Sequence, residues 1–354
     1  GKLVSDPEDE INNVKQQVNS SVSGLNLAST SSEGPRGILN DLVVECIDNK
    51  NGNEITVKEF NEQEVYRNFS TPRGLALIIN NRNFTQMAER VGTDIDEHNL
   101  KNLFTQLGYR ISVVKDLTAK VVVASAFFFV VHFLCCQNRE EMLQAIQVFS
   151  KRSEHKLLDS CIVSVLTHGE HNEIFGIDDV PVSVHEFMSS LNALNCPALA
   201  HKPKIFILQA CRGQRYDPGI HVNEDATDTF VGTCFGLGLK HNACAAALSQ
   251  KHVIILLPSE ADFLIAYATV PGYVSWRNSI RGSWFIQSLC EVFAKFSKQS
   301  DILEMMTLVN KRVAEVYESS RDAYKQVPEC ATRLRKKFFF FPGLSISSVS
   351  STSI

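Results

Sequence analysis

The stretch KPKIFILQACRG, residues 202–213, joins an apolar strand pattern to a reactive side chain. Residues 204–209 are apolar between a lysine and a glutamine, which predicts a buried central strand of a parallel sheet. Cys211 follows two residues after Gln209, where Gly213 favours a turn. Catalytic groups of open α/β sheets lie at the carboxyl ends of the strands, so we expect Cys211 to be presented there as a nucleophile.

A histidine follows a second strand pattern of the same kind. His168 lies 43 residues upstream of Cys211, in LTHGE (166–170), directly after the apolar run 160–166. Each residue alone is more often structural, but both leave strands at the same edge of the sheet, which favours a catalytic pair. A cysteine supplies the thiolate and a histidine protonates the leaving amine. The amides of Gly169 and Cys211 are the expected oxyanion hole.

The chain from about residue 73 onward has the pattern of an α/β fold. Short apolar runs alternate with amphipathic stretches, as in a mostly parallel sheet with helices on both faces. The expected strands are 75–80, 111–114, 160–166, 204–209, 263–269 and 337–341. Two stripes at helical spacing are expected core faces: Leu100, Leu103, Phe104 and Leu107, and Val184, Phe187, Leu191 and Leu194.

Charge and cysteine usage exclude several classes of function. The 354 residues carry 35 basic and 39 acidic side chains, a net charge of −4, so a nucleic-acid partner or an anionic membrane surface is not expected. Residues 1–70 hold twelve acidic and six basic side chains, so this excess is local. None of the ten cysteines forms a C-x-x-C pair or zinc-ligand spacing with histidine. We expect no metal, no disulfide framework and no cofactor.

Three segments stand apart from this pattern. Residues 17–40 are rich in Ser, Asn and Gly and are interpreted as a linker, and the start of the chain shows neither methionine nor a secretory leader. The true N-terminus is therefore expected to be missing, and the cytosol is the default compartment. The run VVVASAFFFVVHFLCC, residues 121–136, is too short to span a bilayer, which needs about 20 residues. Residues 230–257 show neither the hydrophobic period of a helix nor that of a strand.

The chain resembles the caspase family, and most closely its nematode cell-death members. The resemblance covers about residues 64–342 and rests on blocks in a fixed order: RGLALIINNRNF, RVGTDIDEHNLKNLF, LTHGE, KPKIFILQACRG, PSEADFLIAYATVPGYVSWRNS and RGSWFIQSLCEVF. It implies a caspase-like sandwich, a six-stranded, mostly parallel sheet between helices. It also implies one chain that is cut into a large and a small subunit and dimerises through the small subunit.

The resemblance also implies a pocket for an aspartate at P1, the substrate residue before the cut bond. The residues that form this pocket in caspases correspond to Arg90, Gln209 and Arg277 of this chain. Two planar guanidiniums can hold one carboxylate by paired charge-assisted hydrogen bonds. By similarity, further residues contact the substrate: Ser275 its backbone, Val274 and Trp276 the P2 side chain, and Asn278 and Trp284 the P4 side chain. Val274 replaces an aromatic residue found in many effector caspases, which leaves the P2 preference open.

By the same resemblance the chain divides into five parts. They are a prodomain remnant and linker (1–63), a large subunit (64–228), an intersubunit linker (229–257), a small subunit (258–342) and a tail (343–354). The sequence DATD, from Asp225 to Asp228, matches the family's processing sites, so self-cleavage after Asp228 is expected. Asp41 and Asp48 are candidate prodomain release points. An adaptor could bind through a missing prodomain.

The large subunit carries an insert at 120–137 whose removal restores the family's spacing. One hypothesis is a short intron translated in frame, which transcript sequencing would test. The alternative is a surface bulge that exposes apolar side chains.

The resemblance therefore implies a cytosolic cysteine endopeptidase that cuts after aspartate in D-x-x-D-like sites and acts in apoptosis. The alternative is a catalytically silent, caspase-like regulator that binds an active caspase or an adaptor. A relative specific for arginine or lysine is remote, because its pocket would need acids where Arg90 and Arg277 stand. The expected partners are protein substrates with P1 aspartate and a second copy of the chain.

Overall fold

Six strands form the central sheet of the computed structural model, which describes residues 39, 42–47, 61–117, 139–220 and 258–344. In order across the sheet they are β11 (Glu329–Thr332), β8 (Phe263–Tyr267), β7 (Lys204–Gln209), β3 (Ser160–Leu166), β1 (Gly74–Asn80) and β2 (Arg110–Lys115). All neighbours are parallel except β11, which is antiparallel to β8. The predicted α/β class with a mostly parallel sheet is confirmed.

The register aligns the carboxyl ends of the central strands. Asn80 of β1 is paired with Leu166 of β3, and Leu166 is paired with Gln209 of β7. The three segments that follow therefore leave the sheet side by side. Because β1, β3 and β7 are buried along their whole length, these ends are fixed by the core.

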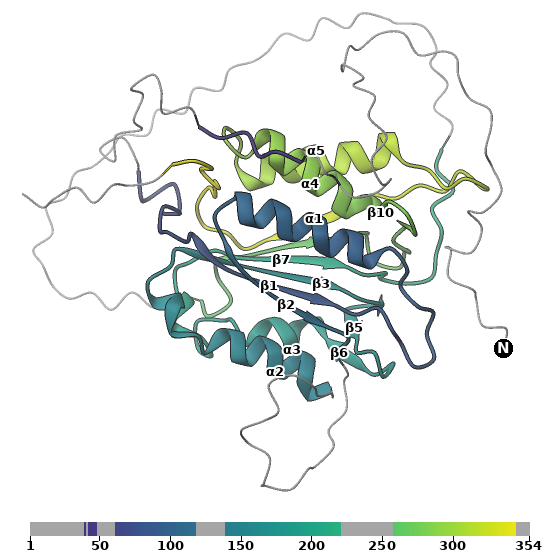
Figure 1. Cartoon of the computed structure of the whole chain (residues 1–354), viewed down its shortest axis with the longest axis horizontal. Helices are drawn as coiled ribbons and strands as arrows, with labels where there is room; N and C mark the ends of the chain where they lie inside the picture. Colours follow the sequence, from purple (N-terminus) through teal and green to yellow (C-terminus); the bar gives the residue numbers. More distant parts are fainter. Residues whose placement is uncertain (1–38, 40–41, 48–60, 118–138, 221–257, 345–354) are drawn as a thin grey trace, which may run out of the picture.

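Helices cover both faces of the sheet (Figure 1). One face carries α1 (Thr93–Gln106), α4 (Trp284–Phe296) and α5 (Ile302–Val316). The other carries α2 (Arg139–Ser150) and α3 (Val184–Ser189). The remaining elements are short: η3 (Ser153–Lys156), η4 (Pro197–Leu199), and two small sheets of β4 (Gly169–Glu170), β5 (Glu173–Phe175) and β6 (Pro181–Ser183), and of β9 (Arg277–Asn278) and β10 (Gly282–Ser283).

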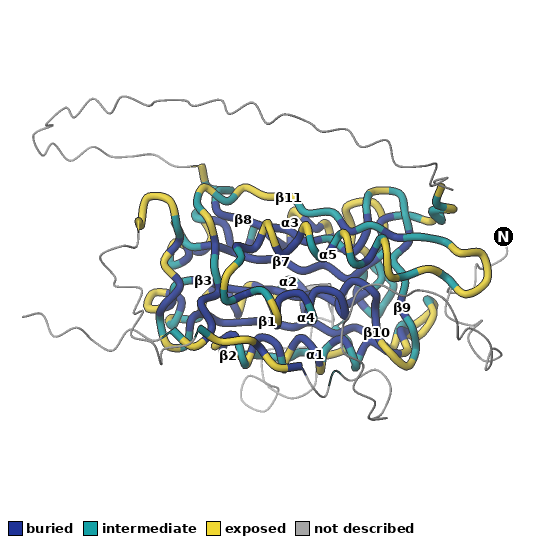
Figure 2. Tube along the Cα trace, turned by 90° about the horizontal axis from the view of Figure 1, so that it is seen from above, coloured by how far each residue is buried: buried dark blue, intermediate teal, exposed yellow. Residues whose placement is uncertain are grey.

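Figure 2 shows that the strands β1, β3 and β7 are buried. Two hydrophobic cores lie on the two sides of the sheet. Alternate strand residues point to each: Ile162 belongs to the core under α1 and α4, and Val163 belongs to the core over α2 and α3. Of the first predicted stripe, Leu100, Leu103 and Phe104 lie in α1, Leu107 is its C-cap, and all four are fully buried.

The predicted strand at 337–341 is wrong. The sixth strand is β11, a short sequence of mixed polarity, while Phe338 and Phe340 are buried in the core without joining the sheet. Lys337 makes only an isolated bridge to Val65. The apolar residues at 337–341 indicate burial in the core and not membership of the sheet. A strand at the sheet edge has one solvent-exposed side, so its sequence need not be apolar. The strand predicted at 263–269 likewise ends earlier, at Tyr267.

The second predicted helical stripe is only partly correct. The helix α3 ends at Ser189, so Leu191 and Leu194 lie beyond it. Leu191 is buried, but Leu194 is 75% exposed. Asn192 accepts hydrogen bonds through Oδ1 from the backbone of residues 194 and 195, and this turn ends the helical period.

Residues 42–47 form a segment, here called the N-terminal strap, that packs on the helical face. Leu42 and Val44 are buried in the core beside α1 and α4. Gln106 of α1 accepts from the Val44 amide (2.8 Å) and donates to the Leu42 carbonyl (2.7 Å). Part of the range 1–63 therefore belongs to the folded core.

The strap is expected to contribute strongly to stability. Val44→Asp places a carboxylate at a site that is 4% exposed, and we expect the Tm to fall by roughly 10 °C. Val43→Asp is the matched control, because Val43 is 71% exposed and its substitution should move the Tm by less than about 2 °C. Thermal unfolding measures both, and equal shifts would show that the strap is not docked.

Several predicted features lie outside the described residues. They are the insert 120–137, the processing residues Asp225 and Asp228, the linker 229–257, and the release points Asp41 and Asp48.

Candidate active site

Cys211 and His168 leave adjacent strands at the same edge of the sheet. Each lies two residues beyond a register pair, Leu166 of β3 with Gln209 of β7, and the Thr167 amide donates to the Gln209 carbonyl (3.1 Å). The turn after His168 packs directly on the turn that holds Cys211. A Cβ atom on Gly169 would lie 2.7 Å from the Cys211 carbonyl oxygen, so only glycine allows this approach.

The imidazole of His168 is held by one carbonyl and one ring. Its Nε2 lies 2.9 Å from the Ala88 carbonyl oxygen, and its ring contacts Phe84 edge-on at 4.6 Å. A carbonyl only accepts, so Nε2 carries the proton and Nδ1 keeps the lone pair. Burial and the charges of Arg90 and Arg277 lower the pKa of His168 to about 3. The ring is therefore neutral at physiological pH.

The thiol of Cys211 lies against the segment before β9. Its Sγ accepts from the Ser275 amide at 3.3 Å and lies 3.8 Å from the Ser275 hydroxyl and 3.9 Å from the Ser275 carbonyl oxygen. Cys211 is partly exposed, whereas Cys161, Cys196 and Cys290 are buried, and burial raises the pKa of these three thiols. Among these thiols, Cys211 has the access that a nucleophile needs.

The guanidinium of Arg90 is buried in the loop between β1 and α1. Arg90 is 1% exposed, and its Nη1 donates to the Asn81 carbonyl (3.1 Å) and to the Thr93 hydroxyl (2.8 Å). The Thr93 hydroxyl in turn donates to Asn80 Oδ1 at 2.7 Å. The carboxyl end of β1 and the first turn of α1 thus hold a buried positive charge at the sheet edge where Cys211 and His168 lie.

A second guanidinium and an amide approach from the other half of the chain. Arg277 of β9 is 9% exposed, and its Nε donates to the Val91 carbonyl (2.9 Å), one residue after Arg90. Gln209 is fully buried at the end of β7 and donates through Nε2 to the Ser275 hydroxyl at 3.1 Å. The predicted trio of Arg90, Gln209 and Arg277 is tied to one site by these contacts.

A buried carboxylate interacts electrostatically with both arginines. Asp96 of α1 is fully buried and accepts from the Ser283 amide (2.8 Å) and hydroxyl (2.5 Å). Ser283 is the strand partner of Arg277. Burial raises the pKa of Asp96 to about 6, although the Ser283 hydrogen bonds and the charges of Arg277 and Arg90 oppose this shift. Asp96 is therefore a counter-charge for both arginines.

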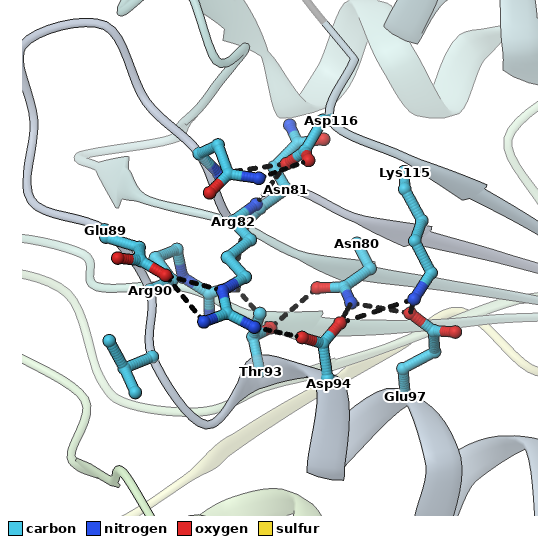
Figure 3. Close-up of polar contacts among 12 residues, drawn as sticks. Asn80, Asn81, Arg82, Glu89, Arg90, Thr93, Asp94, Glu97, Lys115 and Asp116 are labelled. Carbon is cyan, nitrogen blue, oxygen red and sulfur yellow. Dashed lines mark hydrogen bonds and ion pairs between the residues drawn. The ribbon is translucent and has the colours of Figure 1, made fainter.

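An ion-pair network holds the loop that carries Arg90 and Ala88, as Figure 3 shows. Arg82 bridges Glu89 (2.6 Å) and Asp94 (2.5 Å), across the two sides of the loop. Lys115 reaches Asp94 (3.3 Å) and Glu97 (2.9 Å). Arg82, Glu89, Asp94 and Lys115 line a polar cavity of about 300 Å³, in which these charges pair with one another. We infer that the network holds the loop in place.

The other predicted substrate contacts gather around two tryptophans. Trp276 and Trp284 stack at 5.6 Å, with Trp284 opening α4. Val274, two residues before Trp276 in the chain, is 8% exposed. Asn278 is half-buried, and its Oδ1 accepts from the amides of residues 280 and 281.

Sequence reasoning missed three residues of the site. Ala88 acts through its carbonyl, which every residue has, so no side-chain pattern marks it. Asp96 stands in the block RVGTDIDEHNLKNLF without a predicted role, because an acid in a first helical turn is common and gives no sign of burial. Tyr216, described below, left no signal at all. Within the described ranges no cluster of three or more His, Cys, Asp or Glu could hold a metal ion.

No helix among the described residues is long and apolar enough to cross a membrane.

Comparisons with known proteins agree with this geometry. A family model described as "Caspase domain" matches residues 73–339. Cell death protein 3 of Caenorhabditis remanei is 45% identical over 291 residues, which are 80% of this chain and 53% of that protein. Caspase-3 of Bos taurus is 38% identical over 286 residues, 78% of this chain and 88% of that protein.

A solved structure has the same fold. Caspase-1 from Spodoptera frugiperda superposes with a TM-score of 0.64 at 30% identity, over 81% of this chain and 96% of that one. The chain spans about half the length of the nematode protein that it matches.

Proposed function

The chain belongs to the caspase family, and from that membership we propose that it is a cysteine endopeptidase that cuts proteins after aspartate and acts in apoptosis. The observation that carries the proposal is the convergence, at one sheet edge, of Cys211, His168 and two buried arginines. A thiol and a neutral imidazole supply the chemistry, and Arg90 and Arg277 supply a reason to require a carboxylate at P1.

The proposed mechanism begins with proton transfer from Cys211 to Nδ1 of His168, because Nε2 already carries a proton. The thiolate then attacks the P1 carbonyl carbon, and the amides of Gly169 and Cys211 stabilise the oxyanion. His168 gives its proton to the leaving amine as the peptide bond breaks and a thioester forms. Water, deprotonated by His168, hydrolyses the thioester, which returns the proton to the cysteine and releases the new carboxylate.

The pocket charges couple substrate binding to this proton transfer. Burial and the charges of Arg90 and Arg277 hold the pKa of His168 at about 3. A P1 carboxylate placed between the two guanidiniums offsets their charge, so it raises the pKa of His168 and helps it to hold a proton. A P1 asparagine gives no such offset, and we expect both its binding and its turnover to suffer.

The direct test is hydrolysis of a fluorogenic Asp-x-x-Asp peptide beside its P1 asparagine counterpart. We expect turnover of the first and at least about 1000-fold lower kcat/KM for the second. An Asp-ending chloromethyl ketone should add to Cys211, as peptide mapping by mass spectrometry would show. Turnover of both peptides at similar rates, or labelling elsewhere, would contradict the proposal. The silent-regulator alternative is not favoured, because Cys211, His168 and all three pocket residues are present.

We also propose the division into a large subunit (64–228) and a small subunit (258–342), with self-cleavage after Asp228. Intact mass and N-terminal analysis of an active preparation should then find a new start at Thr229, and an unchanged intact chain would contradict this. We favour Asp41 over Asp48 as a release point, because a cut after Asp48 would detach the docked strap. A cytoplasmic homodimer through the small subunit, and an adaptor bound through a prodomain, complete the proposal.

The protonation of Asp96 is expected to lower the activity at acid pH, which gives the pH profile of kcat/KM an acid limb. Its pKa of about 6 lies above that of an unfolded aspartate, so the folded chain holds the proton more tightly, and ionising Asp96 costs stability as pH rises from about 4 to 6. Below pH 6 the neutral Asp96 no longer balances Arg90 and Arg277. We expect kcat/KM for a P1 aspartate peptide to fall below pH 6.

The matched variants are Asp96→Asn and Asp94→Asn. The first keeps an acceptor for Ser283 but has no charge, so it should lose the acid limb and show, at pH 7.5, the low activity that wild type shows at pH 5. Asp94 is 42% exposed and the Arg82 and Lys115 contacts lower its pKa, so its variant should keep the limb. An unchanged limb in Asp96→Asn would assign it to another group.

A further inference from the structure

Five aromatic rings form a continuous cluster beside the proposed active site. Trp276 is its centre, stacked on Trp284 at 5.6 Å and on Tyr324 at 6.0 Å. Tyr317 extends the cluster beyond Trp284 at 5.5 Å. The fifth ring, Tyr216, lies 5.8 Å from Trp276 and 5.0 Å from Tyr324. Tyr216 alone comes from the segment that follows Cys211.

The backbone on both sides of Tyr216 is anchored. On one side, the Arg215 amide donates to the Gly272 carbonyl (3.0 Å), and the Val274 amide donates to the Arg215 carbonyl (3.0 Å). On the other side, the Lys325 amide donates to the Asp217 carbonyl (2.8 Å). These bonds place the ring between the segment before β9 and the segment before β11.

Two glycines allow the close approach that brings Tyr216 to the cluster. A Cβ on Gly213 would lie 2.4 Å from the Gly272 backbone, and a Cβ on Gly272 would lie 2.3 Å from the Arg215 guanidinium. Both glycines have positive φ, 154° and 90°, which favours glycine in any case. The position of Tyr216 is therefore built into the turn that also carries Cys211.

Tyr216 supplies a wall that residue 274 does not. Val274 is small and 8% exposed, so it brings no aromatic ring to Trp276. Tyr216 brings a ring to the same indole from the other half of the chain. Tyr216 and Tyr324 both pack on Trp276, the residue that the resemblance assigns to the P2 side chain, so two rings take up space beside it. We infer that Tyr216 is a specificity-determining residue that restricts the substrate residue before the P1 aspartate to small side chains.

This inference rests on the proposed peptidase function and deepens it. The test compares kcat/KM for three peptides, Asp-x-Ala-Asp, Asp-x-Val-Asp and Asp-x-Phe-Asp, in wild type and in Tyr216→Ala. We expect the ratio of the phenylalanine to the valine peptide to rise about tenfold in the variant, since pocket-size discrimination is commonly of that order. Tyr216→Phe keeps the ring and should keep the wild-type ratio.

The control is Ile220→Ala, four residues further along the same segment at a site that is 88% exposed. It should leave both the ratio and the rates unchanged. A ratio within twofold of wild type in Tyr216→Ala would overturn the inference, even if the Tm falls, because a purely structural ring would lower the rate for all three peptides equally.

A second readout does not depend on turnover. The chain has two tryptophans, and both lie in the cluster, so intrinsic fluorescence reports on this site. In a Cys211→Ala background, peptide titration gives Kd values without cleavage, and Tyr216→Ala should shift the phenylalanine-to-valine Kd ratio about tenfold toward phenylalanine. An unshifted ratio overturns the inference. If wild type cleaves none of the peptides, the proposed function fails separately and the Kd ratio still decides the role of Tyr216.

Discussion

A chain carrying Cys211→Ala is expected to hydrolyse an Asp-x-x-Asp peptide at least about 10,000-fold more slowly than wild type. The variant has no nucleophile to form the thioester, and what remains is binding and the oxyanion hole. Peptide binding should persist, because Arg90 and Arg277 are untouched. Steady-state kinetics and tryptophan fluorescence measure the two properties separately.

The partner variant His168→Ala should lose nearly as much, and the double variant should be no worse than Cys211→Ala. Two groups that act in one proton transfer are strongly non-additive, whereas independent groups would multiply their losses. Cys46→Ala is the control, since Cys46 is an exposed thiol on the strap and its loss should leave kcat/KM unchanged. Residual turnover above one part in a hundred in Cys211→Ala would place the nucleophile elsewhere.

The second large effect concerns the proposed P1 pocket. Arg277→Lys keeps a positive charge but loses the planar fork and the Nε donor to the Val91 carbonyl, so kcat/KM for the P1 aspartate peptide should fall about 100-fold. Arg277→Gln also removes the charge from a site that is 9% exposed, and we expect about 1000-fold. Enzyme kinetics on purified variants checks both.

The selectivity of these variants is as informative as their rate. In Arg277→Gln the preference for P1 aspartate over asparagine should shrink, since one of the two guanidiniums that distinguish them is gone. Arg281→Lys is the matched control, because Arg281 is exposed four residues further along the chain. If Arg277→Gln lowered the rate for both peptides equally, the role of Arg277 would be structural and Asp96 would be paired with it for folding alone.

The proximity of the proposed catalytic pair could be predicted because the two residues leave adjacent parallel strands. Cys211 and His168 each follow an apolar strand by two residues, and strands in register bring equal offsets together. The same rule failed for the sixth strand. Its residues are not apolar, since β11 sits at an edge, while Phe338 and Phe340 carry the apolar signal into the core without pairing.

The charge balance of the pocket could not be read from the sequence. Arg277 lies far along the chain from Arg90 and Asp96 and meets them only because α1 packs beside β10 and α4. An arginine and an aspartate are ordinary surface residues until burial makes each depend on the other. Tyr216 was missed for a similar reason: its place is set by the glycines at 213 and 272, which let two loops touch.

The two halves of the chain are interleaved through the core. β8 pairs with β7, α4 packs on α1, and the strap hydrogen-bonds to the backbone of Ala294 in α4. While the chain is continuous, the halves meet at the effective concentration of a tether, on the order of millimolar. A cut within 221–257 removes the tether but leaves the contacts among the described residues in place. Unfolding then separates the pieces, and refolding becomes a second-order reaction that slows on dilution. A cleaved molecule is therefore expected to remain folded, but to refold much more slowly than the continuous chain once it has unfolded.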